Sequence, residues 1–551
     1  MVYPKIPLAQ SVIELCKTNG IQHIIISPGS RNAPLTIGFT NNPFFTCYSI
    51  VDERCAAFFA MGIAQQLQKP TALVCTSGSA ILNYYPAVAE AFYSQIPLVV
   101  LSADRPANKI DIGDGQTIRQ ENVLEKHTVF NANLSETASK ENDILIQKAL
   151  QSSINLKGPV HINVPFEEPL YETLTSPSYF PFIQNESLSQ LHEDDTIDFS
   201  KKWQSSLKKV VLIGAQMPNE LSQEVIDKLA NDPTVSVWVE KNSNTQHPTF
   251  IDALDTFITP LSDSEKANFK PNLLVSIGGM LVSKRIKKYF RDYNPSEHWH
   301  IDTLRAYDTF GVLTAHVKEQ SDVFFKKMYI NAIQQDATYA LDINKKFTDL
   351  KLKRELYLSS VPYSDFMVYN TIAKLLPFNS HLQSSNSAAI RYFQLIDLPS
   401  TVSVFCNRGT SGIDGSTSTA IGAAVASSTP TVLVTGDISF FYDSNGLWNN
   451  YIPSDFKIIL VNNQGGGIFR ILPGHKENKT FDTFFETQHH LQASHLCKMY
   501  DVKYDSVVNE QELLNKLPHF MSSSKGPSLL EIITPTALSS EILLNFFKKI
   551  T

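Results

Sequence analysis

Short, uninterrupted apolar runs recur along this chain, each followed by a turn and then by a stretch of helical composition. In the first third of the chain they are HIIIS (23–27), TALVCTS (71–77) and PLVVLSA (97–103). Strands of a parallel sheet are covered by helices on both faces, so they read as continuous apolar runs rather than as alternating patterns. The repeated pattern therefore predicts an α/β fold.

The same pattern returns in two later blocks of the sequence. Its strand-like runs there are residues 208–215, 235–241, 272–279, 403–409, 431–437 and 456–463. A chain of 551 residues exceeds what one hydrophobic core normally supports. We predict three consecutive α/β domains with mostly parallel sheets, at residues 1–180, 200–340 and 355–551, and a polar linker at about Thr173–Lys202.

The overall composition excludes several classes of function. Apolar residues make up 43% and charged residues 18% of the chain, which is typical of a globular protein. The net charge of −7 provides no basic excess for a nucleic-acid partner. No apolar run approaches the roughly 20 residues needed to span a bilayer, and the first ten residues lack the basic and apolar parts of a signal peptide. We expect a soluble, cytoplasmic protein that binds neither nucleic acid nor membrane.

Two strand-end turns in the third block carry oxygen ligands. Asp437 directly follows TVLVTG, and Asn463 directly follows KIILVN. Parallel strands end at the same edge of a sheet, where α/β folds bind ligands, so we expect these side chains to lie close together. A carboxylate, an amide oxygen and one backbone carbonyl suit Mg²⁺, and diphosphate oxygens and water would complete its coordination. The glycines after Asn463 would let backbone N–H groups approach the phosphates.

Each of these turns also has a purely conformational interpretation. Gly, Asp and Asn populate turns for backbone reasons alone. The string Gly113-Asp114-Gly115 illustrates this, because no apolar strand precedes it and no Asn pair follows it. We predict that this string is an ordinary loop, whereas the ordered pair of motifs in the third block favours a ligand site.

The Gly-Asp motif followed by Asn-Asn resembles the signature of thiamine-diphosphate enzymes. The resemblance implies that Asp437, Asn463 and the carbonyl of Gly465 bind Mg²⁺, with Mn²⁺ as a possible alternative ion. The third position of the motif is usually Gly in that family and is Ile438 here, which changes the backbone beside the diphosphate. The implied cofactor-binding residues are Glu53, Ile413, Gly436, Asp437, Ile438, Ser439, Asn463, Gly465, Gly466, Gly467, Ile468 and Phe469.

Thiamine chemistry also needs a carboxyl group beside the aminopyrimidine ring. Glu53 follows a short apolar stretch and begins an apolar helix. Apolar surroundings raise the pKa of a carboxyl group, so that it exchanges a proton near neutral pH. The alternative is an acidic residue that only stabilises the start of its helix.

Several cationic and polar residues stand at other turns. Ser30 and Arg31 lie on a turn that leads into a helix, an arrangement suited to an anion. A single arginine is usually exposed at a protein surface, but as a group these residues indicate a pocket for substrates with several carboxylates. The remaining candidates are Arg105, Gln116, Lys284, Arg285, Ser387, Arg391 and Arg408.

The strings SPGSR, DER, SADRP, NRGTSGIDG and NNQGGGIF together resemble the 2-succinyl-5-enolpyruvyl-6-hydroxy-3-cyclohexene-1-carboxylate synthase family of menaquinone biosynthesis. The resemblance spans nearly the whole chain and is thinnest in the middle third. It implies a transferase that decarboxylates 2-oxoglutarate and adds the resulting succinyl carbanion to isochorismate. Both substrates are dianions, which gives the arginines a purpose.

The resemblance also implies roles for individual residues. Ser387, Arg391 and Arg408 would hold carboxylates near the thiazolium ring. Ile413 would bend the cofactor, and Ile468, Phe469 and Leu472 would form an apolar wall, with ordinary core packing as the alternative for these four. Isochorismate or the intermediate would contact Arg31, Arg105, Gln116, Lys284 and Arg285. The family pairs its N- and C-terminal domains between subunits, so a homodimer or homotetramer is expected.

Three rival functions remain at this stage. A relative of acetolactate synthase would share the cofactor residues but has less reason for so many arginines. A thiamine-diphosphate-binding scaffold without catalysis is disfavoured by an intact Glu53. A nicotinamide dehydrogenase is disfavoured because the glycines at residues 277–280 do not form a GxGxxG motif.

Overall fold

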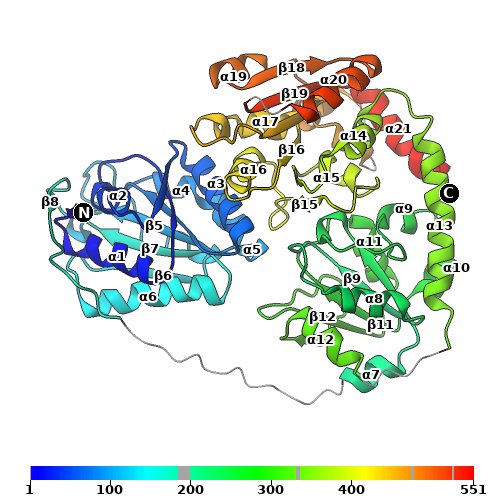
Figure 1. Cartoon of the computed structure of the whole chain (residues 1–551), viewed down its shortest axis with the longest axis horizontal. Coiled ribbons are helices and arrows are strands. Elements are labelled where there is room, and N and C mark those ends of the chain that lie inside the picture. The colour runs from blue at the N-terminus through cyan, green and yellow to red at the C-terminus, as the bar shows by residue number, and fades with distance from the viewer. Residues whose placement is uncertain are drawn as a thin grey trace.

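The computed structural model describes residues 2–183, 199–330, 336–472, 474, 477–523 and 526–550. Three α/β units follow one another along the chain: an N-terminal unit (blue to cyan), a middle unit (green) and a C-terminal unit (yellow to red) (Figure 1). Each unit is built around one parallel sheet. The predicted architecture of three consecutive α/β units with mostly parallel sheets is confirmed.

The N-terminal sheet has six parallel strands in the order β3-β2-β4-β5-β7-β6. Helices α1, α2 and α6 cover one face, and α3 and α5 cover the other, so alternate strand residues enter two separate cores. The strands are β2 (His23–Ile26), β3 (Thr46–Ser49), β4 (Thr71–Cys75), β5 (Leu98–Asp104), β6 (Phe130–Asn133) and β7 (Val160–Pro165). The helices are α1 (Pro7–Thr18), α2 (Ala33–Thr40), α3 (Glu53–Leu67), α4 (Ala80–Asn83), α5 (Tyr85–Ser94) and α6 (Lys140–Asn155).

The middle sheet has five parallel strands in the order β10-β9-β11-β12-β13. Helix α13 (Tyr339–Leu358) leaves this unit and contacts both α9 and the C-terminal helix α21, linking the two units along one side of the molecule (Figure 1). The strands are β9 (Lys209–Ile213), β10 (Val235–Val239), β11 (Leu273–Ile277), β12 (Glu297–Ile301) and β13 (Ala315–Val317). The helices are α7 (Phe199–Ser205), α8 (Gln223–Asn231), α9 (Leu254–Ile258), α10 (Asp263–Phe269), α11 (Lys284–Asp292) and α12 (Ser321–Met328).

The C-terminal sheet has six parallel strands in the order β15-β14-β16-β17-β19-β18. Strands β16 and β17 are neighbours, which brings their carboxyl ends together. The strands are β14 (His381–Ser384), β15 (Ser403–Phe405), β16 (Thr431–Gly436), β17 (Lys457–Asn462), β18 (Lys503–Val507) and β19 (Ser528–Ile533). The main helices are α14 (Asp365–Leu375), α15 (Ala388–Phe393), α16 (Ser416–Val425), α17 (Asp437–Tyr442), α19 (Ser494–Met499), α20 (Glu510–Ser522) and α21 (Thr536–Lys549).

The predicted linker at about Thr173–Lys202 is too long at both ends. Strand β8 (Thr173–Leu174) pairs with β1 (Tyr3–Pro4), and helix α7 begins at Phe199. The polar composition of this segment did not predict either element, because each is stabilised by contacts with distant parts of the chain rather than by its local sequence. The rest of the predicted linker lies largely outside the described residues. No helix in the described part of the chain is long and apolar enough to cross a membrane.

Helices α3 and α16 join the N-terminal unit to the C-terminal unit. A Cβ atom on Gly62 would lie 2.1 Å from the carbonyl oxygen of Thr419, and one on Gly422 would lie 2.0 Å from that of Phe59. The two helix backbones therefore touch, and only glycine leaves room at these crossing points. The hydrophobic core is continuous across this contact.

We expect Gly422→Ala to lower the free energy of unfolding by about 1–3 kcal/mol, because the added methyl group overpacks this contact. The loss should occur although alanine favours helix over glycine by about 1 kcal/mol. Urea denaturation measures the difference. Gly115→Ala is the control, since a Cβ there meets open space. Equal stability of the two variants would contradict the close approach.

Candidate active site

The structure brings the two predicted strand-end turns together. Asp437 begins α17 immediately after β16, and Asn463 follows the neighbouring strand β17. The Asp437 carboxylate is buried and accepts hydrogen bonds from the N–H groups of Ile438 (2.7 Å) and Gly465 (2.9 Å). The carboxylate therefore fastens the glycine-rich loop after β17 to the start of α17.

The Asn463 side chain has one oxygen without a partner. Its Nδ2 donates to Asp365 Oδ2 at 3.0 Å, which sets the orientation of the amide, and its buried Oδ1 accepts no hydrogen bond. Buried polar atoms are nearly always paired, so this oxygen needs an explanation. In the described part of the chain no three His, Cys, Asp or Glu side chains form a metal-binding group. A mixed set of Asp437, this amide oxygen and a backbone carbonyl fits the oxygen preference of Mg²⁺.

The glycine loop after Asn463 is held from outside. Gly465 has φ +155°, and a Cβ there would lie 2.9 Å from the carbonyl oxygen of Glu486. That carbonyl also accepts the Gly466 N–H at 2.6 Å, and the buried Glu486 carboxylate pairs with Arg470. His489 Nε2 lies 3.2 Å from Asp437 Oδ2. Glu486, Arg470 and His489 were not selected from the sequence, because no motif connects them to the loop they support.

Apolar residues surround this loop without being part of the main cores. Ser439 donates a hydrogen bond to the carbonyl oxygen of Ile413 at 2.7 Å, which ties Ile413 to the start of α17. Ile413, Ile468 and Phe469 are only partly buried, and Leu472 is 40% exposed. Their partial exposure favours the interpretation as an apolar wall over that as core packing.

Glu53 stands at the first position of α3 but does not cap it. Asp52 performs the capping, accepting hydrogen bonds from the N–H groups of Arg54 and Cys55. Burial raises the pKa of the Glu53 carboxyl above its ordinary value and nearby Asp52 adds to this, while a backbone N–H bond opposes it. Asp52 therefore supplies the cap of α3, while Glu53 accepts a backbone N–H at the same helix start.

Within the chain, Glu53 and Asp437 belong to different places. Arg54 donates to the carbonyl oxygen of Tyr442 at 2.8 Å, so the start of α3 meets the last residue of α17, whereas Asp437 is its first residue. Among the described residues, no hydrogen bond or ion pair joins Glu53 to the Asp437 loop.

The predicted cationic residues form two groups rather than one. In the first group, Arg408 donates to Asn386 Oδ1 (2.7 Å) and to the carbonyl oxygen of Leu281 (3.2 Å), just before α11. Arg391 donates to the carbonyl oxygen of Ser387 at 2.7 Å, and burial, followed by repulsion from Arg408, lowers its pKa. This group spans the middle and C-terminal units.

Helix α11 adds further positive charge to this group. Arg285 lies over the Phe547 ring at 3.9 Å, and its pKa is lowered by burial despite nearby Asp255. Lys287, which sequence reasoning missed, has its pKa lowered by burial and then by Arg408, with a smaller contribution from Lys284. Its position three residues after Lys284, on the same helix face, could have indicated it.

The second group lies in the N-terminal unit. Arg31 is 3% exposed and donates to the carbonyl oxygen of Phe166 and to Glu168 Oε1, both at 3.0 Å. Arg105 pairs with Asp114 at 3.6 Å. Gln116 lies beside Gly78, and Ser30 is exposed. In the described residues, no hydrogen bond or ion pair links this group to the Arg391 and Arg408 group.

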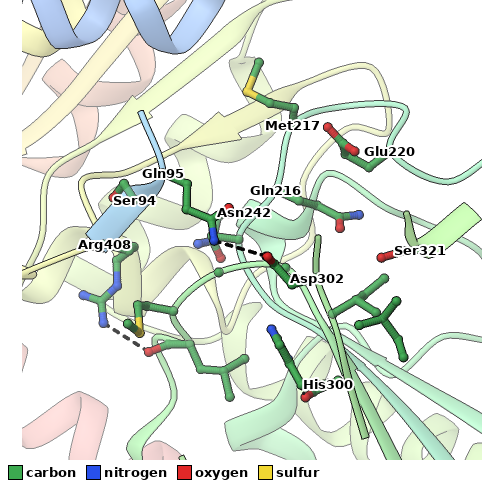
Figure 2. Close-up of a pocket in the computed structure, with 18 of the residues that line it drawn as sticks. Ser94, Gln95, Gln216, Met217, Glu220, Asn242, His300, Asp302, Ser321 and Arg408 are labelled. Carbon is green, nitrogen blue, oxygen red and sulfur yellow. Dashed lines mark hydrogen bonds between the residues drawn. The ribbon is translucent and has the colours of Figure 1, made fainter. Parts of the chain in front are cut away.

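A cavity of about 700 Å³ opens between the three units and is separate from the Asp437 loop (Figure 2). Gln95 Nε2 donates to Asp302 across it at 3.2 Å. Of the residues selected from the sequence, only Arg408 contributes to its lining. The cavity therefore touches the first cationic group but not the metal and diphosphate loop.

A buried carboxylate lies behind Arg408. Glu240, at the end of β10, accepts hydrogen bonds from the N–H groups of Val282 and Ser283 at 2.7–2.8 Å. Burial raises the pKa of Glu240 to about 7, against the opposing effects of those N–H groups and of Arg408. Sequence reasoning missed Glu240, because an acid after a strand carries no distinctive signal.

A known family model matches the first part of the chain. Residues 6–128 match the thiamine pyrophosphate enzyme, N-terminal TPP binding domain. This match, the three parallel sheets and the paired glycine loops define the chain as a thiamine pyrophosphate (thiamine diphosphate) enzyme.

Similarity to relatives over their full length shows which family of thiamine-diphosphate enzymes the chain belongs to. The chain is 59% identical to the 2-succinyl-5-enolpyruvyl-6-hydroxy-3-cyclohexene-1-carboxylate synthase of Flavobacterium psychrophilum, over 100% of both chains. Identity is 56% to the protein of the same name from Flavobacterium johnsoniae (100% of both chains) and 47% to that from Christiangramia forsetii (99% of both). The chain belongs to the 2-succinyl-5-enolpyruvyl-6-hydroxy-3-cyclohexene-1-carboxylate synthase family.

The raised pKa of Glu240 predicts a pH-dependent stability. Because the folded protein binds the Glu240 proton more tightly than the unfolded chain, stability falls as pH rises from the ordinary value of 4.5 through about 7. Each unit between the two pKa values corresponds to about 1.4 kcal/mol. We expect Glu240→Gln to lose less stability than the wild type between pH 5 and pH 8, measured by urea denaturation. The exposed Glu136→Gln is the control, and parallel curves for wild type and Glu240→Gln would refute the assignment.

Proposed function

We propose that this chain, with thiamine diphosphate and Mg²⁺, decarboxylates 2-oxoglutarate and adds the succinyl fragment to isochorismate in menaquinone biosynthesis. The observation that carries the cofactor assignment is the buried, unpaired Oδ1 of Asn463 beside the Asp437 carboxylate. The relatives' printed name supplies the product. A cytoplasmic location is part of the same proposal.

Asp437, Asn463 and the carbonyl of Gly465 would hold Mg²⁺ or Mn²⁺, and the N–H groups of the glycine loop would face the diphosphate. When bound, the cofactor supplies the electron sink that stabilises a carbanion after loss of CO₂. The protein binds, orients and excludes water around it. Ile413, Ile468 and Phe469 would cover its apolar side, and Glu53 would exchange a proton with its aminopyrimidine ring.

The cationic residues support the proposal that the substrates are dianions. Arg391 and Arg408 lie close enough to lower the pKa of Arg391, and such mutual repulsion is relieved when a carboxylate binds between them. The Arg408 Nε is buried without a partner and so has a donor available for an anion. We assign Ser387, Arg391 and Arg408 to substrate carboxylates near the reacting carbon. Isochorismate or the intermediate would bind Arg31, Arg105, Gln116, Lys284 and Arg285.

A second copy of the chain would complete the site. The proposed chemistry needs Glu53 at the aminopyrimidine end and the Asp437 loop at the diphosphate end of one cofactor, and the family that the chain belongs to pairs the two domains that carry them between subunits. The division of the cationic residues between two separate groups supports the same arrangement. We propose a homodimer, or a homotetramer of such dimers, in which each site combines Glu53 of one copy with Asp437 of the other.

The rival carboligase function makes a different substrate prediction. An acetolactate-type enzyme shares the cofactor loop but condenses small monoanions. The group of Arg391 and Arg408 favours the dianionic substrates, since among the described residues neither arginine forms an ion pair, and a buried arginine without a carboxylate partner is costly.

We expect the protein to consume isochorismate when Mg²⁺, thiamine diphosphate and 2-oxoglutarate are supplied. The loss of isochorismate absorbance measures this consumption. Glu53→Gln should lower kcat by about 10²–10⁴-fold, the usual contribution of a positioned proton-transfer group, while the fold is retained. Glu136→Gln should match the wild type. Turnover of pyruvate in place of both substrates would favour the rival, and near-normal turnover of Glu53→Gln would remove the proton-exchange role.

We expect Asp437→Ala to abolish Mg²⁺-dependent binding of thiamine diphosphate in calorimetry, because it removes the only carboxylate of the donor set. Asp455→Ala removes an exposed carboxylate near the same sheet and should bind normally. An Asp437→Ala protein with unchanged cofactor affinity would overturn the metal assignment.

A further inference from the structure

Glu90 is a buried acid to which no described residue contributes a cationic partner. It lies on α5 of the N-terminal unit and is 2% exposed. Its carboxylate accepts hydrogen bonds from the N–H groups of Gly409 and Thr410, both at 2.6 Å, and from the hydroxyl of Thr410 at 2.8 Å. The Ser94 hydroxyl adds one more at 2.8 Å. Among the described residues, the ion pairs include none with Glu90.

Burying a carboxylate without a counter-ion is energetically costly unless hydrogen-bond donors surround it. A buried carboxylate without a counter-ion loses its hydration, and hydrogen bonds from N–H and O–H groups must replace it. Three of the four donors belong to residues 409–410 of the C-terminal unit. The Glu90 carboxylate therefore stabilises the loop at residues 409–410 rather than its own helix.

The contacted loop carries Arg408. Arg408 is 7% exposed, and its guanidinium donates to Asn386 Oδ1. The Nδ2 of Asn386 in turn donates to the carbonyl oxygens of Asn407 and Gly412. At the other end of the loop, the carbonyl of Ile413 accepts the Ser439 hydroxyl. Within these contacts, only Glu90 reaches the loop from the N-terminal unit.

The loop approaches α5 as closely as a backbone can. A Cβ on Gly409 would lie 2.4 Å from the carbonyl oxygen of Glu90. Glycine at this position lets the Gly409 and Thr410 N–H groups reach the carboxylate. We call the hydrogen bonds from Gly409 and Thr410 to the Glu90 carboxylate the Glu90 clamp. By fixing the backbone at residues 409–410, this clamp also fixes the direction in which the side chain of the preceding residue, Arg408, points.

We infer that Glu90 is a positioning residue, which holds the 408–413 loop and thereby directs the Arg408 guanidinium toward a substrate carboxylate. The inference rests on the proposed function, in which Arg408 binds that carboxylate. On this proposal, the interface between the N- and C-terminal units contributes to substrate affinity. Glu90 itself does not contact the substrate in this proposal.

The test begins by finding which substrate Arg408 serves. Arg408→Ala should raise the KM of one of the two dianions, and Glu90→Gln should raise the KM of the same one by about tenfold, the effect of losing a charge-assisted hydrogen bond. The KM of the other substrate and kcat should change little. Glu90→Asp should restore part of the affinity, because it returns the charge. Ser94→Ala, which leaves all three loop bonds intact, is the matched control and should behave as wild type.

Coupling separates positioning from a general loss of stability. In the Arg408→Ala background, Glu90→Gln should cause little further rise in KM, since the residue acts through Arg408. Thr410→Val removes one donor and should shift the same KM in the same direction, by less, if Glu90→Gln folds poorly. An additive effect of Glu90→Gln, or a fall in kcat with both KM values unchanged, would overturn the inference.

Hydrogen exchange tests the clamp without turnover. The Gly409 and Thr410 amides should be protected in the wild-type protein and should exchange faster in Glu90→Gln, while the Gly465 amide at Asp437 keeps its protection. Unchanged exchange at residues 409–410 would refute the clamp. If the wild type shows this protection but no turnover with 2-oxoglutarate and isochorismate, then the proposed function fails, and with it the role in substrate affinity.

Discussion

The contact between α3 and α16 determines how the rest of the molecule is arranged. Because Gly62 and Gly422 let two backbones touch, the N-terminal and C-terminal units share one hydrophobic core. Buried Asp443 reinforces this contact, because its carboxylate accepts from the Ser418 N–H of α16 at 2.7 Å and from the Cys55 thiol of α3 at 3.5 Å. Burial raises the pKa of Asp443 to about 6. The Glu90 clamp and the Arg54 bond to Tyr442 both depend on the same relative position of the two units.

Four residues of the predicted site keep a buried polar atom without a hydrogen-bond partner, as do buried residues elsewhere in the described chain such as Arg54 and Arg354. Arg31, Arg105 and Arg408 each keep a buried Nε without an acceptor, and Asn463 keeps a buried Oδ1 without a donor. An unsatisfied buried group costs about 1–3 kcal/mol, and a bound anion or metal ion would supply the missing partner at these four positions. The cavity in Figure 2, in contrast, includes only one of these residues, Arg408.

Much of the fold and part of the site could be predicted from sequence because their signals are local. Buried parallel strands are continuous apolar runs, and Asp437 and Asn463 directly follow two of them. The supporting residues Asp365 and Glu486 could not be found this way, since each reaches the loop from a distant segment. The same holds for Glu90, an ordinary helix residue by sequence.

By itself, the sequence determined the α/β class, the order of the three units and the two strand-end turns whose pattern resembles the cofactor signature. These properties depend on residues that are neighbours in the chain. Only the tertiary structure decided that the cationic residues form two groups and that Glu90 meets Gly409. These pairings depend on strand order and on helix contacts between units, which bring together residues hundreds of positions apart and leave no local pattern.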